Sequence, residues 1–476
     1  MAAVEEAEEE VAAVQDKHHE ESRRKLEPRN PRPKASVKAW IISVDMGYGH
    51  QRAAYPLKDI AFERILTANN DKIISIKERK LWENSRNIYE TISRIKSIPL
   101  IGSFIFDIYD KLQKISPFFP FRDQSKPSFA TLRLEKLIKK GFGKSLVEYT
   151  SKENIPIITT HPFPSLMFDY NNKEVYSVVT DTDINRAWVS DYPKQSKIIF
   201  FAPCKHVVMR LKQYRVQENK IIETGFPLPK ENIGEHDEIV KKDLLSRLIN
   251  LDPTGIFFQK YRGLLIEQFG LTPNQKFDDT ARKKFKTHTF TITYAIGGAG
   301  AQKEIATDII QSLTEKIISR EIILNIIVGV KLDLRMYFET AVKSFGLEEN
   351  LGQNINIIFA LDKKTLFATT NTILRTTDIL WTKPSEMSFY TALGLPIIIA
   401  PPIGDHENFN KEWLEHLGSG FVQKDPKFTK EWIYYWLQDG RLADAAIHGF
   451  MDAPRRGTYN IEKFLTEKCL HEKENI

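Results

Sequence analysis

The chain has 476 residues, of which 42% are hydrophobic, and a formal net charge of +6 at pH 7. This length exceeds one hydrophobic core and predicts two domains with extensions, while so mild a positive charge does not indicate nucleic acid as a partner. With only Cys204 and Cys469, the composition argues against a disulfide framework or a zinc site and favours the cytoplasm, and no apolar run reaches the ~18–20 residues of a membrane span.

The first 38 residues differ in composition from the rest. Positions 1–21 carry eight acidic residues and one basic residue, whereas positions 22–38 carry one acidic residue and seven basic ones. The stretch has neither apolar periodicity nor the apolar core of a signal peptide, and its acids argue against a transit peptide. The sequence therefore predicts a solvated, disordered tail at 1–38.

Beyond residue 38, strand-like runs alternate with segments able to form helices. Such alternation predicts parallel sheets that helices cover on both faces. Because the runs fall into two series, we expect an α/β protein with two doubly wound, Rossmann-like domains that face each other across a cleft. The predicted strands are 39–45, 155–159, 175–180 and 197–201 in the first domain, and 289–296, 322–328, 355–358, 378–382 and 396–400 in the second.

The first predicted strand ends in a glycine turn, Asp45-Met46-Gly47-Tyr48-Gly49-His50. Ligands of open parallel sheets bind at the carboxyl ends of strands. Gly47 and Gly49 would let the backbone turn tightly and approach a ligand, and His50 could accept a proton near neutral pH. A glycine turn with a surface histidine is the alternative interpretation.

A second glycine turn follows the strand at 289–296 and precedes an amphipathic helix. Its sequence, Gly297-Gly298-Ala299-Gly300-Ala301-Gln302, matches neither the P-loop nor the G-x-G-x-x-G fingerprint. Glycines that admit phosphate oxygens, next to the N–H groups of a helix N-terminus, nevertheless suit a diphosphate. We expect Gly298, Gly300 and Gln302 to bind it; a turn without a ligand is the alternative.

Two consecutive strand ends in the second domain carry many polar side chains. The stretch "DILWTKPSEMSFYTALGLPIIIAPPIGDHENFN" contains both of them. A ribose and a sugar need many hydrogen-bonding partners, so these residues are candidates for a donor-sugar site. They are Lys383, Ser385, Glu386, Ser388, Asp405, His406 and Glu407.

These stretches resemble the two-domain GT-B glycosyltransferases, in particular the monogalactosyldiacylglycerol synthases, processive diacylglycerol glucosyltransferases and the peptidoglycan GlcNAc-transferase. Besides the D-x-G-x-G-H turn, the second glycine turn and "ILWTKPS…ALGLPIII", three matches lie in family order. They are His161-Pro162 in "TTHPFP", Asp181 and Trp188 in "VVTDTDINRAW", and Gly225-Phe226-Pro227. The resemblance covers about residues 39–229 and 287–425.

The resemblance implies transfer of a sugar from a nucleotide diphosphate sugar, most simply a UDP-sugar, to a membrane-associated acceptor, with diacylglycerol-type lipid as one candidate. His50 would be the general base, oriented by Asp181, and Gly47, Gly49 and His161 would lie on the acceptor side. Although "TDTD" at 180–183 contains a D-x-D, the resemblance implies no bound metal and no cofactor.

The chain departs from the family pattern in several places. Ser385 stands where the family has glycine, and Thr391 stands where a helical glutamate grips the donor ribose; Glu386 is a candidate replacement. The family's two spacer residues between Leu393 and Gly394 are missing, and its Gly-Gln-Glu segment reads Gly404-Asp405-His406-Glu407 here. The departures at Ser385 and Thr391 leave open a non-catalytic nucleotide-sugar-binding protein, and a nucleotide-sugar 2-epimerase on the same scaffold is a second alternative.

An apolar stripe in the first domain is a candidate acceptor or membrane surface. Ile101, Phe104, Ile105, Ile108, Leu112 and Ile115 recur at helical spacing, followed by Phe118, Phe119 and Phe121. A basic series comes next, formed by Arg133, Lys136, Lys139, Lys140 and Lys144. Such a pair of stripes suits peripheral binding to the inner, anionic face of a membrane, whereas an ordinary core-facing helix is the alternative.

The expected domain order follows from these assignments. After the tail at 1–38 come an acceptor-side domain at 39–229, a charged insert at 230–286 with helices near 237–250 and 256–269, and a nucleotide-sugar domain at 287–427. Residues 428–476, rich in aromatic side chains, are expected to form helices that pack back across the domains.

Overall fold

A computed structural model describes residues 37–83, 115–127, 129–269, 288–297, 300 and 302–474. The predicted tail, the part of the apolar stripe at 101–112 and Gly298 lie outside these residues, as does the side chain of Asp405. None of the described helices is long and apolar enough to cross a membrane.

The N-terminal domain is built on a parallel sheet with the strand order β2-β1-β3-β4-β5-β6. Its strands are β1 (Ala39–Ser43), β2 (Ala61–Thr67), β3 (Ile157–Thr159), β4 (Val175–Val178), β5 (Ile198–Ala202) and β6 (Ile221–Glu223). Its helices are α2 (Gly49–Ala54), η1 (Tyr55–Ile60), α5 (Phe129–Lys139), α6 (Lys144–Thr150), α7 (Pro162–Tyr170), η2 (Arg186–Trp188), α8 (Lys205–Gln213) and η3 (Glu218–Lys220).

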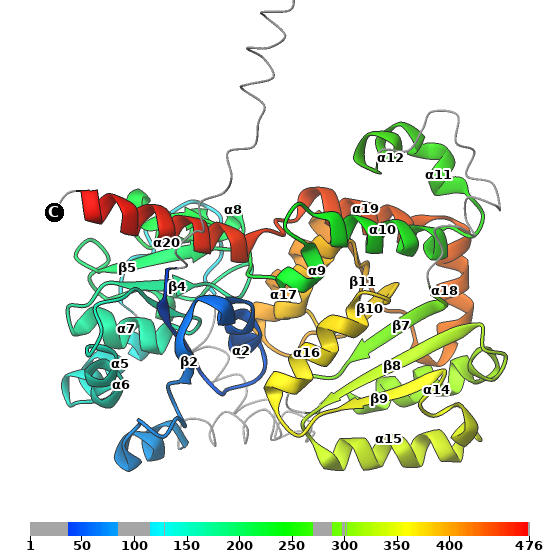
Figure 1. The fold of residues 1–476 in the computed structure, drawn as a ribbon, viewed down its shortest axis with the longest axis horizontal. Helices are drawn as coiled ribbons and strands as arrows, with labels where there is room; N and C mark the ends of the chain where they lie inside the picture. The colour runs from blue at the N-terminus through cyan, green and yellow to red at the C-terminus, as the bar shows by residue number, and fades with distance from the viewer. Residues whose placement is uncertain are drawn as a thin grey trace, which may run out of the picture. The chain divides into compact units, whose positions relative to one another are not determined.

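The C-terminal domain contains a second parallel sheet, ordered β12-β11-β10-β7-β8-β9 (Figure 1). Its strands are β7 (Phe290–Ala295), β8 (Ile322–Gly329), β9 (Ile355–Phe359), β10 (Ile379–Thr382), β11 (Ile397–Ile399) and β12 (Gly420–Val422). The connecting helices are α14 (Lys303–Ile318), α15 (Leu332–Ser344), η4 (Glu348–Asn350), α16 (Lys363–Leu374), η5 (Glu386–Leu393), α17 (Asp405–His416) and η6 (Pro426–Phe428).

The predicted fold class is confirmed: the protein is α/β and has two doubly wound, Rossmann-like domains. Counted within the C-terminal domain, its strands follow the Rossmann order 3-2-1-4-5-6. In each sheet the chain reverses its direction of travel beside the first strand, at β1 and β3 in one domain and at β7 and β10 in the other. Ligands of this fold bind at such switch points, at the carboxyl ends of the strands.

The central strands are fully buried, which explains why the sequence predicts them well. In β1, β7 and β11 every side chain is buried, in keeping with a sheet covered on both faces. All nine predicted strands are present. Three strands were missed, β2, β6 and β12, and each lies at a sheet edge. Edge strands are short or polar, so they lack the continuous apolar run that marks a central strand.

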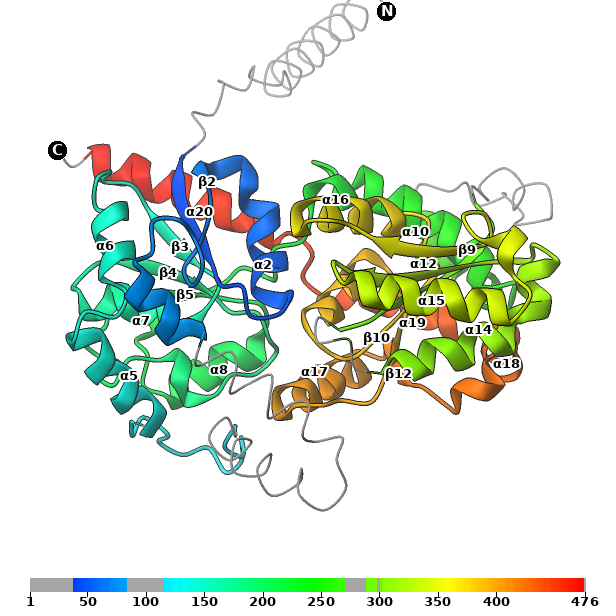
Figure 2. The same cartoon turned by 90° about the horizontal axis from the view of Figure 1, so that it is seen from below.

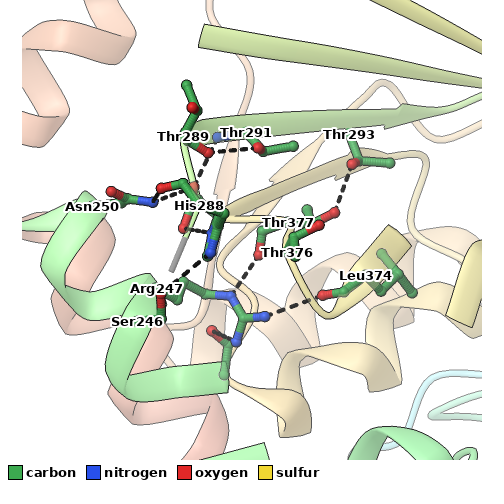
Figure 3. Close-up of polar contacts among 12 residues, drawn as sticks. Ser246, Arg247, Asn250, His288, Thr289, Thr291, Thr293, Leu374, Thr376 and Thr377 are labelled. Carbon is green, nitrogen blue, oxygen red and sulfur yellow. Dashed lines mark hydrogen bonds and ion pairs between the residues drawn. The ribbon is translucent and has the colours of Figure 1, made fainter. Parts of the chain in front are cut away.

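The predicted helices of the insert are confirmed as α10 (Glu238–Leu251), α11 (Ile256–Lys260) and α12 (Arg262–Phe269), preceded by α9 (Lys230–Ile233). A buried arginine anchors α10 to the C-terminal domain (Figure 3). Arg247 donates hydrogen bonds to the carbonyl oxygens of Thr377 (2.7 Å) and Leu393 (2.8 Å), and Asn250 bonds the Asp378 carboxylate (3.0 Å). The first part of the insert thus packs as a layer of the C-terminal domain.

Three helices end the chain, α18 (Thr429–Gln438), α19 (Arg441–Asp452) and α20 (Gly457–Glu474). Figure 1 shows α20 lying along the N-terminal sheet. There the ring of Phe464 packs edge-on against Phe201 and Tyr176, and the carbonyl oxygen of Thr224 accepts a bond from Asn460. The last helix therefore returns to the domain in which the chain begins.

Candidate functional site

The turn after β1 uses its two glycines for different purposes. Gly47 has φ +86°, a conformation that side chains disfavour. Gly49 has an ordinary φ, but a Cβ there would lie 3.2 Å from Oε2 of Glu386. Gly47 therefore permits the turn, and Gly49 lets Glu386 of the C-terminal domain lie close to the backbone. Because α2 has only six residues, we do not assign an anion site to its N-terminus.

The hydrogen bonds of His50 determine its tautomer. Its Nδ1 lies 2.5 Å from the carbonyl oxygen of Thr160, which can only accept, so Nδ1 carries the proton. The Thr160 hydroxyl in turn donates to the His50 carbonyl oxygen at 2.7 Å. Nε2 is left as the basic nitrogen, and it has no hydrogen-bond partner among the described residues. This is the arrangement that a general base requires.

Charges from both domains act on His50. Burial lowers the pKa of its imidazole below the usual value, while the carboxylates of Asp181 and Glu386 oppose that shift and His406 adds to it. His50 and Asp181 come from the N-terminal domain, whereas Glu386 and His406 come from the C-terminal one. The lowered pKa keeps His50 neutral, and thus able to accept a proton, at pH 7.

His161 lies beside His50 and has the opposite tautomer. Its Nδ1 accepts a bond from the Phe163 N–H (3.1 Å) at the start of α7, so its proton is on Nε2. The two imidazole rings meet edge to face with centroids 4.5 Å apart. Burial, together with the neighbouring His50, lowers the pKa of His161 well below its usual value. His161 therefore caps a helix and is a neutral neighbour of His50.

The predicted orienting role of Asp181 falls to a different group. The Thr160 carbonyl, not Asp181, holds Nδ1 of His50. Asp181 instead bonds Asn410 on α17 (3.0 Å) and influences His50 through its charge. The second carboxylate of the D-x-D, Asp183, is buried in bonds to Arg210 and His206, so the two aspartates face different partners.

The turn after β7 contains Gly297, Gly300 and Gln302 in the geometry expected of a turn that opens a helix. The Gly300 N–H donates to the Gly297 carbonyl oxygen (2.8 Å), and Gly300 has φ +75°. Gln302 precedes α14 and also has a positive φ of 66°. Its side-chain amide donates to the Pro401 carbonyl oxygen (2.7 Å), so it ties this turn to the loop after β11. Its side-chain amide is thus engaged within the protein, and its carbonyl oxygen accepts a bond from the Tyr294 hydroxyl (3.1 Å).

Two lysines lie against this turn, one of them unpredicted. A Cβ at Gly300 would be 3.5 Å from Nζ of Lys331, which follows β8. A Cβ at Gly297 would lie 2.8 Å from Cε of Lys383. Lys383 forms an ion pair with Glu407; burial opposes ionisation of Glu407, but Lys383 and His406 hold its pKa below the usual value. Lys331 has no motif around it, and only the fold places it here.

The remaining predicted donor residues occupy two kinds of position. Ser385, Glu386 and His406 are half-buried at strand ends, and Gly404 leaves room for the His406 ring, whose Cε1 would lie 2.9 Å from an added Cβ. Ser388, by contrast, is fully buried within η5. Thr391, the other departure from the family pattern, faces α19, where a Cβ on Gly449 would collide with it. A glutamate could not occupy that packed position, which accounts for the departure.

Polar contacts join the N-terminal strand ends to the C-terminal domain, and sequence reasoning missed the following four. Asp45 pairs with Lys363, Tyr48 accepts a bond from the Val330 N–H (3.2 Å), Arg52 pairs with Glu386 (3.2 Å), and Asp181 with Thr182 binds Asn410. The C-terminal partners Val330, Lys363, Glu386 and Asn410 follow β8, β9, β10 and β11, respectively. No local pattern signals pairs more than 200 positions apart. In the part of the chain described, no three histidine, cysteine or carboxylate side chains are grouped to hold a metal ion.

Comparison of the sequence with family models matches residues 270–463 to a domain of unknown function, DUF6938. No curated protein matches the chain.

Solved structures with a similar backbone include three bacterial proteins. The S. aureus MnaA–UDP structure is 9% identical, with 91% of this chain and 95% of that chain covered at a TM-score of 0.44. UDP-GlcNAc 2-epimerase from Neisseria meningitidis, bound to UDP-GlcNAc, is 11% identical (91% and 100% covered, TM-score 0.44). Acinetobacter baumannii MurG is 12% identical (90% and 99% covered, TM-score 0.43). At these identities and TM-scores, no functional residue is transferred from those proteins to this one.

Proposed function

We propose that this protein is a glycosyltransferase that moves a sugar from a nucleoside diphosphate sugar to an acceptor hydroxyl. The observation that carries the proposal is the state of His50: neutral, protonated on Nδ1 by its bond to Thr160, with Nε2 free to take a proton. It lies where the strand ends of the two domains meet, beside Glu386 and His406 of the donor domain. A base in that position can reach an acceptor held between the two domains.

The proposed reaction is a single displacement. Nε2 of His50 takes the proton of the acceptor hydroxyl while its oxygen bonds the anomeric carbon of the sugar. The bond between that carbon and the diphosphate oxygen breaks, and the nucleoside diphosphate leaves with the electron pair. A hydroxyl is a poor nucleophile, so a base with a pKa near or below ambient pH suits this step. One displacement predicts inversion at the anomeric carbon.

The proposed donor site is the turn at 297–302. Gly297 and Gly300 allow phosphate oxygens close to the backbone, and α14 presents N–H groups and a positive dipole end. The ammonium of Lys331 lies against the same turn. These groups neutralise a leaving diphosphate without a metal ion. The sugar would lie toward Glu386, His406 and the Lys383–Glu407 pair.

The proposed acceptor is membrane-associated, with a diacylglycerol-type lipid as the first candidate. Phe119 and Phe121 are 67% and 57% exposed although their rings pack edge to face. The basic series predicted to bind anionic lipid, Arg133, Lys136, Lys139, Lys140 and Lys144, is exposed throughout. An exposed aromatic pair and an exposed basic series in the same domain favour an anionic membrane surface. Co-sedimentation with phosphatidylglycerol vesicles, compared with phosphatidylcholine vesicles, should show binding that a Phe119→Ser, Phe121→Ser variant loses.

Product analysis with a labelled UDP-sugar tests the reaction class. Transfer of label to a lipid or glycoside acceptor supports the proposal. Conversion of UDP-GlcNAc into its C2 epimer would instead identify an epimerase, and binding without turnover of any donor would identify a non-catalytic protein. Calorimetric titration of UDP in EDTA should show binding; strict dependence on Mg²⁺ would contradict the metal-free donor site.

A further inference from the structure

Asn410, on α17 of the C-terminal domain, uses its whole side chain to bridge the two domains. It is fully buried. Its Oδ1 accepts bonds from both the N–H and the hydroxyl of Thr182, each at 2.9 Å. Its Nδ2 donates to Oδ1 of Asp181 at 3.0 Å and to the Pro384 carbonyl oxygen at 3.4 Å. Two donors and two accepted bonds saturate the amide.

These partners leave one orientation for the amide. The Thr182 N–H can only donate, so the atom that faces it is oxygen. The Asp181 carboxylate and the Pro384 carbonyl can only accept, so the atom that faces them is nitrogen. Rotating the amide by half a turn would place donor against donor at the Thr182 N–H and acceptor against acceptor at Asp181 and Pro384. Asn410 is therefore a rigid bridge between the end of β4 and the end of β10.

A chain of polar contacts connects Asn410 to His50 through Asp181 and Thr180. Asn410 holds Oδ1 of Asp181, and Oδ2 of the same carboxylate accepts a bond from the Thr180 hydroxyl at 3.4 Å. That hydroxyl is 3.5 Å from Nδ1 of His50. The orientation of Asp181, and with it the position of its negative charge, thus depends on a side chain from the other domain.

We infer that Asn410 is a positioning residue that holds Asp181 beside His50 when the two domains are in contact. The inference rests on the proposed role of His50 as base, but its physical content, coupling of Asn410 to His50 through Asp181, is independent of turnover. The charged or titratable groups that face His50 are Asp181 and His161 from its own domain and Glu386 and His406 from the other. Only Asp181 is bonded to Asn410.

Titration of His50 tests the coupling without any substrate. The full-length protein is labelled with ¹³C-histidine, the His50 signal is assigned with a His50→Gln variant, and its pKa is measured by NMR. Asn410→Ala is introduced into the wild-type protein and into Asp181→Asn. We expect Asn410→Ala to shift the His50 pKa in the wild-type background and to shift it markedly less in Asp181→Asn. Equal shifts in both backgrounds, or none in either, would overturn the inference.

Two further variants separate positioning from packing. Asn410→Asp has nearly the same shape and keeps the acceptor for Thr182, but it turns an oxygen toward Asp181. It should therefore shift the pKa of His50 even where Asn410→Ala unfolds the interface. Asn408→Ala, on the exposed part of the same helix, should leave the His50 titration unchanged. A shift from Asn408→Ala equal to that from Asn410→Asp would also refute a specific bridge.

Kinetics provides a second readout. If transfer is observed, Asn410→Ala should lower kcat by about tenfold, because a small displacement of a catalytic group costs up to ~10²-fold, with the donor KM nearly unchanged. The same substitution in Asp181→Asn should cost much less. A purely structural role predicts additive losses. If the wild-type protein transfers no sugar, the proposed function fails, and the titration alone decides the role of Asn410.

Discussion

The two glycine turns look alike in the sequence but differ in what surrounds them. The turn at Gly47–His50 has neighbours from both domains. Glu386 and Val330 of the C-terminal domain lie next to Gly49 and Tyr48, and Thr160 of its own domain lies next to His50. The turn at Gly297–Gln302 lies against lysine side chains of its own domain, Lys331 and Lys383. Figure 2 shows α2 at the side of its domain and α14 beneath the C-terminal sheet. A glycine after a strand indicates that another group comes close to the backbone there. The tertiary structure determines whether that group belongs to the other domain or to the same one.

The largest effect should come from the first turn. His50→Ala should reduce sugar transfer by ~10²–10⁴-fold, as removal of a positioned base does. Nucleotide affinity should change by less than about tenfold, or ~1.4 kcal/mol, because the proposed donor site at Gly297–Gln302 lies in the other domain. Paired transfer rates and calorimetric titrations measure both. Near-normal transfer by this variant would show that the first turn has only a structural role and that the two turns do not differ in function as proposed.

Because the first turn contacts the other domain, breaking that contact should lower the free energy of unfolding. The Arg52–Glu386 pair joins the domains with side chains only 4% and 12% exposed. Arg52→Ala leaves a buried carboxylate without its partner and should cost about 3–5 kcal/mol in free energy of unfolding. Urea denaturation measures the loss. Lys58→Ala removes an exposed pair with Glu231, 37% and 44% exposed, and should cost at most ~1 kcal/mol; similar losses from both variants would refute the burial argument.

The second turn should respond to loss of a charge. Lys331→Ala removes the ammonium next to Gly300 and should weaken UDP binding by about 10- to 100-fold, since a hydrogen bond to a charged group is worth ~1.5–3 kcal/mol. Transfer at saturating donor should fall much less. Lys343→Ala, an exposed lysine later in α15, serves as the control. If both lysines have the same small effect on the UDP Kd, Lys331 is no phosphate ligand.

The pH dependence of transfer tests the state of His50. Its folded pKa is lowered from 6.5, and only the neutral imidazole can act as base. The value of kcat/KM should therefore fall as pH decreases through a midpoint below 6.5 and stay level near pH 7. Asp181→Asn removes a charge that raises this pKa, so the midpoint should move further down. A midpoint above 6.5 in the wild-type protein would indicate a different base.

The smallest effect is expected outside both turns. Deleting residues 1–36, which have no apolar periodicity, should leave the Tm and the UDP Kd unchanged. Differential scanning calorimetry and titration of the truncated protein measure this. A large fall in Tm would show that the tail contributes to the folded core.

Much of the fold could be predicted from local patterns. Continuous apolar runs identified the central strands of both sheets, and their spacing predicted two doubly wound domains. The edge strands were missed because β2 contains Glu63 and Arg64 and because β6 and β12, unlike the equally short but fully buried β3 and β11, include exposed positions. The helices α10 and α14 were found because amphipathic periodicity is itself a local property.

For the site, the sequence by itself determined which residue types follow each strand: glycines and a histidine after β1, glycines after β7, and lysine, serine and carboxylates after β10 and β11. Backbone conformation and hydrogen-bonding capacity are properties of single residues, so they can be predicted from the sequence. Only the tertiary structure decided their partners. It paired His50 with Thr160, Glu386 with Arg52 and Asp181 with Asn410, and it placed Lys331 next to the turn at Gly297–Gln302. Those pairings join segments far apart in the sequence, two of them within a domain and two between domains. They depend on tertiary packing, whose free energy is spread over many contacts that no short stretch encodes.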